Sequence, residues 1–151
     1  MPKPASTIEC DLDPKVDAIV VFGRSDHGSI PRGASRALNL WVDHSDPNFG
    51  HCSIYLLTER LNVYVELQCW HSVFKVDLIS QDLLLEMIGG MPYTHALRVQ
   101  RRVNLRPWRC RLGMTCVSVA KHALALDAPW VFTPRQLFRY LVGQQGVTPL
   151  I

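Results

Sequence analysis

The chain has 151 residues, of which 48% are hydrophobic and 19% charged, and its formal net charge at pH 7 is +3. This length fits one domain with a real core, and this balance excludes an intrinsically disordered chain. The net charge is too small to indicate nucleic acid by itself. We therefore expect a single domain over residues 1–151, with a loose lead-in over residues 1–15.

The N-terminus and the cysteines indicate the compartment. The first residues, MPKPASTIECDLDP, contain no apolar segment of the kind found in signal peptides, and no stretch of the chain approaches the ~18 apolar residues of a spanning helix. The five cysteines are odd in number and irregularly spaced, without a C-x-x-C pair: Cys10, Cys52, Cys69, Cys110 and Cys116. We expect a soluble, cytoplasmic protein with free thiols, although export by a route that the chain does not encode stays open.

The first elements lead to a histidine. Ala18 to Phe22 (AIVVF) is a short, wholly apolar run that predicts a buried strand. Turn residues follow, and Ala34 to Val42 then shows helical spacing. A second turn-rich segment, HSDPNFG, immediately precedes His51.

Two antiparallel strands are predicted next, from His51 to Leu57 and from Asn62 to Trp70, joined by a polar turn. Alternation places His51 on one face of the first strand and Cys52 on the other. On the second strand, Glu66 and Gln68 share a face. A histidine and a carboxylate could thus lie on the same side of one sheet, but the register that decides this is not given by the sequence.

Further strands and helices are predicted along the rest of the chain. Ser72 to Ile79 predicts a strand, and Ser80 caps a helix that runs to Ile88 and is stopped by two glycines. Thr94 to Val103 predicts another strand. Thr133 and Pro134 then open a last helix that ends at Gly143.

Cys116 is the candidate nucleophile. It lies in LGMTCVSVAKHALAL, where Gly113 breaks the preceding segment and Thr115 is a competent N-cap. A thiol in the first turn of a helix meets unpaired N–H groups and the positive end of the helix dipole, which favour the thiolate. The alternative is that Cys116 is a small apolar residue on a core-facing helix.

Three strings occur along the chain in the order FGHCSIYL, VYVELQ and TCVSVAKHALAL, the last followed by TPRQLFRYL. In sequence and in order they resemble the circularly permuted branch of the NlpC/P60 papain-like cysteine hydrolase superfamily. The resemblance covers residues 51–141. It implies an α+β, permuted papain-like fold in which a small antiparallel sheet packs against helices. It also implies that Cys116 is the nucleophile, His51 the base and Glu66 the residue that orients the base. The third position varies in this superfamily, so Gln68 is the alternative to Glu66.

The activity implied by this resemblance is that of a cysteine peptidase or amidase, or more broadly a thiol hydrolase or acyltransferase, without a cofactor. The bond would be an amide, a peptide or an acyl ester, and the resemblance does not choose among them. Neither the substrate nor the oligomeric state follows from the sequence.

A block of basic residues supports a competing interpretation. No acid occurs between Glu86 and Asp127, whereas seven basic residues do: Arg98, Arg101, Arg102, Arg106, Arg109, Arg111 and Lys121. If the block surrounds Cys116 in space, it would favour the thiolate and an anionic substrate. It could equally be a solvated strand and loop, or the surface with which a catalytically inactive papain-like module binds an acidic partner. We do not expect nucleic acid, because only Trp108 interrupts the block.

A metal site is not expected. His51 and Cys52 are adjacent, so on a strand their side chains point to opposite faces, and Cys69-x-His71 has no second pair at zinc-finger separation. We interpret Cys52 and Cys69 as structural residues inside strands.

Overall fold

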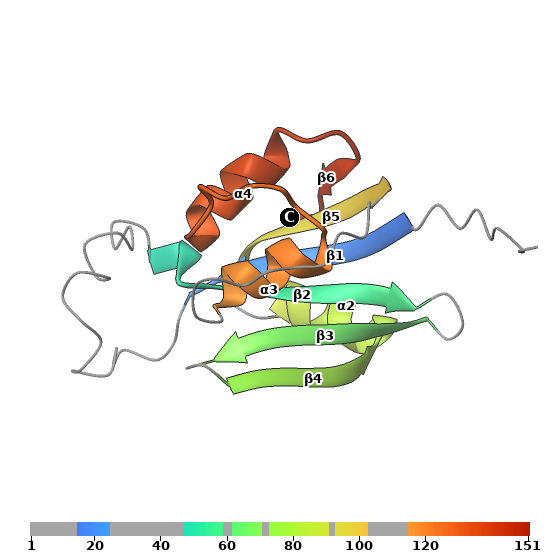
Figure 1. Ribbon diagram of the computed structural model, residues 1–151. Coiled ribbons are helices and arrows are strands. Elements are labelled where there is room, and N and C mark those ends of the chain that lie inside the picture. Colours follow the sequence, from blue (N-terminus) through green and yellow to red (C-terminus); the bar gives the residue numbers. More distant parts are fainter. Residues whose placement is uncertain (1–14, 25–46, 59–61, 71–72, 91–92, 103–114) are drawn as a thin grey trace, which may run out of the picture.

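The computed structural model describes residues 15–24, 47–58, 62–70, 73–90, 93–102 and 115–151. These residues form a six-stranded antiparallel sheet with helices on both faces (Figure 1). The strands lie in the order β4-β3-β2-β1-β5-β6, so the first strand of the chain is inside the sheet. Their bounds are Lys15–Gly23 (β1), His51–Thr58 (β2), Val63–Trp70 (β3), Val73–Ser80 (β4), Tyr93–Arg102 (β5) and Val147–Pro149 (β6).

The apolar run at residues 18–22 forms the centre of β1, as predicted. Val20 pairs with Ile54 on β2 and with Leu97 on β5. Its even-numbered neighbours contribute to one core and its odd-numbered neighbours, Ile19 and Val21, to the core on the other face. The run is wholly apolar because this strand is buried on both faces.

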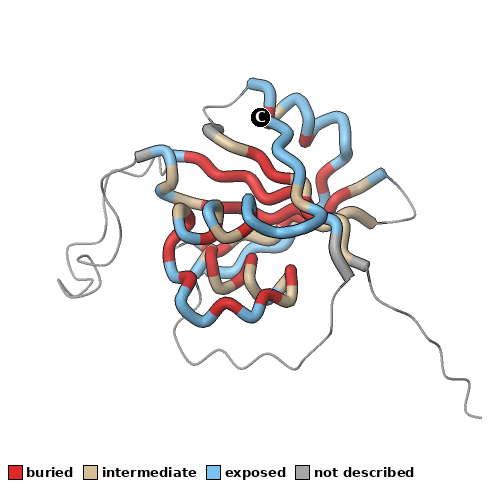
Figure 2. The backbone as a smooth tube through the Cα atoms, turned by 90° about the horizontal axis from the view of Figure 1, so that it is seen from above, coloured by how far each residue is buried: buried red, intermediate tan, exposed pale blue. Residues whose placement is uncertain are grey.

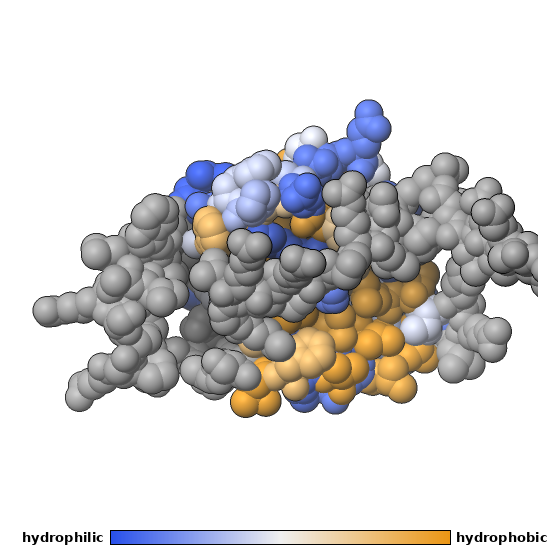
Figure 3. Space-filling model, viewed as in Figure 1, coloured by the Kyte–Doolittle hydropathy of each residue, from blue (hydrophilic) through white to orange (hydrophobic). Residues whose placement is uncertain are grey.

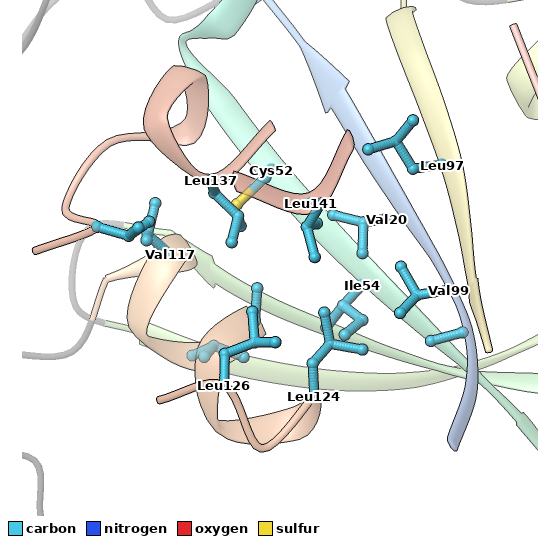
Figure 4. Packing of buried hydrophobic residues seen from close by; sticks show 14 of the residues in the cluster. Val20, Cys52, Ile54, Leu97, Val99, Val117, Leu124, Leu126, Leu137 and Leu141 are labelled. Carbon is cyan, nitrogen blue, oxygen red and sulfur yellow. The ribbon is translucent and has the colours of Figure 1, made fainter. Parts of the chain in front are cut away.

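Helices α3 (Cys116–Ala123) and α4 (Pro134–Val142) pack over one face, and α2 (Gln81–Gly90) packs on the other. The short 3-10 helix η1 (Pro47–Phe49) precedes β2. Figure 4 shows the core under α3 and α4, where Cys52 points from β2 toward the helices beside Leu137. Buried residues follow the inner strands, whereas the outer sides of the helices are exposed (Figure 2).

All three predicted N-caps are present, and the Oγ atom of Ser80 accepts a hydrogen bond from the backbone N–H of Leu83 at 3.3 Å. Thr115 and Thr133 accept hydrogen bonds from the backbone N–H groups of Ser118 and Gln136, and the side chains of Ser118 and Gln136 accept hydrogen bonds from the backbone N–H groups of the two cap residues. Such capping boxes satisfy two helix-end groups at once and fix where the helix begins. The first turn of α3 is therefore set by the local sequence.

Two features of the fold differ from the sequence-based expectations. Helix α2 continues through Gly89 and Gly90 instead of stopping before them, and both glycines are exposed in the last turn, where helix ends fray. The sheet also contains β6, an edge strand that was not predicted, while the predicted strand β1 lies inside the sheet. Gly146 permits the approach of β6, since it has a φ of 76° and a Cβ there would lie 2.1 Å from the carbonyl oxygen of Gln100.

The structure thus confirms the α+β class. The lead-in up to residue 14, the helical spacing at residues 34–42, Cys10, Cys110 and three members of the basic block (Arg106, Arg109 and Arg111) lie outside the described residues. Among the helices in the described part of the chain, none combines the length and apolar character needed to cross a membrane.

Candidate active site

Cys116 is the first residue of α3, directly after its N-cap. The N–H of Ser118 donates to Thr115 Oγ1 at 3.0 Å, and the N–H of Thr115 donates to Ser118 Oγ at 2.8 Å. The buried side chains of Val117 and Ala120 hold the helix on the sheet, where it packs on β2 and β3. The thiol is therefore presented at a rigid helix start above the beginning of β2.

The sulfur of Cys116 contacts His51 and Cys52, the first two residues of β2. It forms hydrogen bonds with both side chains and with the backbone of Cys52. The structure thus brings together the cysteine and the histidine that the sequence singled out.

His51 reaches this site from the end of its strand. In the middle of a strand, two consecutive side chains point to opposite faces and could not contact the same atom. His51 is the first residue of β2, and Gly23, its partner on β1, has no side chain to occupy the space beside it. The Nε2 atom of His51 is buried.

These contacts make Cys116 the more acidic of two adjacent thiols. The hydrogen bond from the Cys52 thiol lowers the pKa of Cys116 well below its usual range, and the hydrogen bond and positive charge of His51 lower it further, against an opposing effect of burial. The hydrogen bond to Cys116, together with burial, raises the pKa of Cys52 well above its usual range. Of the two thiols, Cys116 therefore loses its proton more easily and Cys52 holds its proton more tightly.

Glu66 occupies a different part of the sheet. It pairs with Tyr55 across β2 and β3, and its Oε1 atom accepts a hydrogen bond from the Tyr55 hydroxyl at 2.8 Å and another from Gln68 Nε2. Tyr55 is four residues along β2 from His51, a separation of about 13 Å in a strand. The register therefore does not favour Glu66 as the residue that orients His51, and this role stays a prediction, as does the alternative role of Gln68.

Cys52 is the member of the site that sequence reasoning missed. Because it follows His51 directly on a strand, alternation assigned it to the opposite face and to a purely structural role. The sequence does show a cysteine directly after the candidate base. That Cys52 contacts Cys116 could not be predicted from this, because the contact depends on how α3 lies on the sheet.

Replacing Cys52 by alanine tests its influence on Cys116. Loss of the donated hydrogen bond should raise the pKa of Cys116 and slow its alkylation at pH 6 by roughly tenfold. Cys69→Ala is the matched control, because Cys69 is also buried in the core under α3. Equal rates in the two variants would show that Cys52 does not influence the nucleophile.

An aromatic cluster adjoins the site. Phe22 pairs with Cys52 on one side and with His95 on the other. The ring of His95 stacks on Phe49 and Phe138, with centroid distances of 5.2 Å and 4.7 Å. His95 is thus held between aromatic rings and, with them, forms an apolar wall at this end of the sheet.

Two members of the basic block have described side chains, and both make contacts within the chain. Arg98 forms a bidentate pair with Asp17, at 3.0 Å and 2.7 Å, and lowers the pKa of that carboxyl. Lys121 donates to the carbonyl oxygen of Val131 at 3.1 Å. Within the described residues, no three His, Cys, Asp or Glu side chains are grouped to hold a metal ion.

Comparison with protein-family models, with curated proteins and with solved structures finds no match for this chain. The function must therefore be argued from the geometry around Cys116.

Proposed function

We propose that this protein is a thiol hydrolase or acyltransferase in which Cys116 is the nucleophile and His51 the proton carrier. The observation that carries the proposal is the contact between the Cys116 sulfur and His51 at the start of a capped helix. A thiolate and an acid–base group within hydrogen-bond reach form the core of covalent acyl-transfer sites.

The reaction proceeds in two steps. The Cys116 thiolate adds to the carbonyl carbon of an amide, peptide or acyl ester, and the imidazolium of His51 gives its proton to the leaving amine or alcohol as the thioester forms. His51 then takes a proton from water or another acceptor, which attacks the thioester. This second step releases the acyl product and returns Cys116 to the thiolate.

The helix start also supplies groups for the oxyanion. The capping box engages the N–H of Ser118, and the N–H of Val119 bonds to the carbonyl of Thr115. Helix geometry leaves the N–H groups of Cys116 and Val117 without an acceptor inside α3. Such groups, at the positive end of a helix, stabilise the negative oxygen that develops during attack on a carbonyl.

A permuted papain-like fold would account for this arrangement. The histidine strand, the acid strand and the cysteine helix occur in the order of the permuted NlpC/P60 branch, and α3 packs on the two strands concerned. The proposed chemistry depends on Cys116 and His51 and does not require this relationship. The alternative of an inactive module that binds an acidic partner gains no support from Arg98 and Lys121, whose described contacts lie within the chain.

Alkylation tests the proposal directly. Because the pKa of Cys116 is lowered well below its usual range, a larger share of this thiol is ionised at pH 6 than of an ordinary thiol, whose pKa is about 8.5. Iodoacetamide should therefore modify Cys116 at pH 6 at least about tenfold faster than Cys10, Cys52, Cys69 or Cys110, as measured by peptide mass spectrometry over time. Slow and equal modification of all five thiols would contradict the proposal and favour the inactive module.

A further inference from the structure

Strand β4 forms one edge of the sheet and is unusually apolar for an edge. No other described strand pairs with its outer side. Four of its side chains are exposed despite being large and apolar: Val73 (66%), Phe74 (45%), Val76 (53%) and Leu78 (75%). A long apolar edge of this kind is a template for pairing with another strand.

Three of these four apolar side chains lie on the face that carries α3. Phe74, Val76 and Leu78 pair with Cys69, Leu67 and Val65 on β3, and Cys69 and Leu67 belong to the core under that helix. Helix α3 packs on β2 and β3. The row formed by Phe74, Val76 and Leu78 on β4 therefore extends this apolar core beyond the area that the helix covers. Figure 3 shows the resulting apolar surface over the lower strands of Figure 1.

The other face of β4 carries Lys75 and Asp77, which form an ion pair within the strand. Asp77 also pairs with Glu66 on β3, so two carboxyl side chains lie directly opposite each other. Like charges in this position destabilise a sheet unless a cation lies close by. A second positive charge on the outer side of Asp77 would therefore stabilise this strand pair.

The sequence of β4 is complementary to itself when it is reversed about Val76. Phe74 corresponds to Leu78, Lys75 to Asp77, and Val73 to Ile79. We propose that two copies of this chain form a homodimer by antiparallel pairing of their β4 strands about a two-fold axis at Val76. Lys75 then lies opposite the partner's Asp77, Phe74 lies opposite the partner's Leu78, and the two sheets become continuous.

The charge pattern identifies the occupant as a second copy. Pairing about Val76 brings the partner's Lys75 to the outer side of Asp77, where a cation offsets the Asp77–Glu66 repulsion, and the two-fold axis repeats this contact in the other subunit. On the opposite face, the apolar rows of both strands meet and are removed from water. The pairing also supplies partners for the outer backbone groups of β4. This interface does not depend on the proposed thiol chemistry, because Cys116 packs over β2 and β3.

Charge reversal tests both the dimer and its register. In Lys75→Asp, two aspartates of one chain face two of the other, and in Asp77→Lys, four lysines meet in the same way. Each variant alone should be monomeric at about 100 µM, a concentration at which we expect the parent to be a dimer, as measured by light scattering during gel filtration with a reductant present. An equimolar mixture of the two variants should form a heterodimer, because every cross-strand pair then joins opposite charges.

The double variant Lys75→Asp/Asp77→Lys should dimerise by itself, since it exchanges the two charges without changing their complementarity. Arg139→Asp on the exposed side of α4 is the matched control for the change in net charge and should remain a dimer. A monomeric parent at about 100 µM, dimers of either single variant, or failure of both the mixture and the double variant to dimerise would each overturn the proposal.

Discussion

Replacing Cys116 with serine should abolish the acyl-enzyme that an activated ester probe traps on this protein. The nucleophile would become a hydroxyl that His51 cannot hold ionised, and we expect labelling to fall by at least about 10³-fold. The fold should survive, because serine is well tolerated in the first turn of a helix and the capping box of Thr115 and Ser118 is untouched. Intact-mass spectrometry after incubation with the probe measures the loss.

The control for this experiment is Cys69→Ser, which also removes one thiol from the core region under α3. This variant should be labelled like the parent once its folding has been verified by circular dichroism. Labelling of Cys116→Ser at the parental rate would show that another residue is the nucleophile.

Replacing His51 with alanine should slow acyl-enzyme formation by roughly 10²- to 10⁴-fold. The variant loses the group that gives a proton to the leaving amine or alcohol, and it also loses the hydrogen bond and positive charge that favour the Cys116 thiolate. Its alkylation profile should therefore move to higher pH, because removal of these two effects raises the pKa of Cys116. Stopped-flow measurement of probe turnover and of alkylation against pH gives both quantities.

His122→Ala is the matched control, because His122 lies exposed on the same helix as the nucleophile. It should change neither the rate nor the pH profile. If His51→Ala retained the parental rate of acyl transfer with a parental pH profile, the catalytic pair proposed here would be wrong.

The parts of the fold that the sequence predicts are those fixed by local chemistry. Thr115 and Thr133 place the starts of α3 and α4, because each is followed three residues later by a side chain that completes a capping box. The run at residues 18–22 predicts a buried strand from its apolar character alone. Hence the position of Cys116 at a helix start could be derived without a structure.

The parts that could not be predicted depend on long-range pairing. Glu66 lies opposite Tyr55 because of the register in which β2 and β3 pair. A different register would have moved Glu66 nearer to His51, and the sequence does not specify the register. Cys52 joins the site because a helix distant in sequence lies above it, and because the preceding histidine is at a strand end where alternation no longer separates the two side chains. Strand β6 depends on the close approach of Gly146 to Gln100, which has no sequence signal beyond the glycine itself.

The interior position of β1 has a consequence for synthesis of the chain. Asp17 on β1 and its partner Arg98 on β5 are 81 positions apart, so one side of β1 stays unpaired until β5 has left the ribosome. During that interval the nascent protein holds a strand that is buried on both faces in the finished fold, and such strands aggregate readily when exposed. The sheet that supports Cys116 is therefore completed late in synthesis, after β5 and the edge strand β6 have emerged from the ribosome.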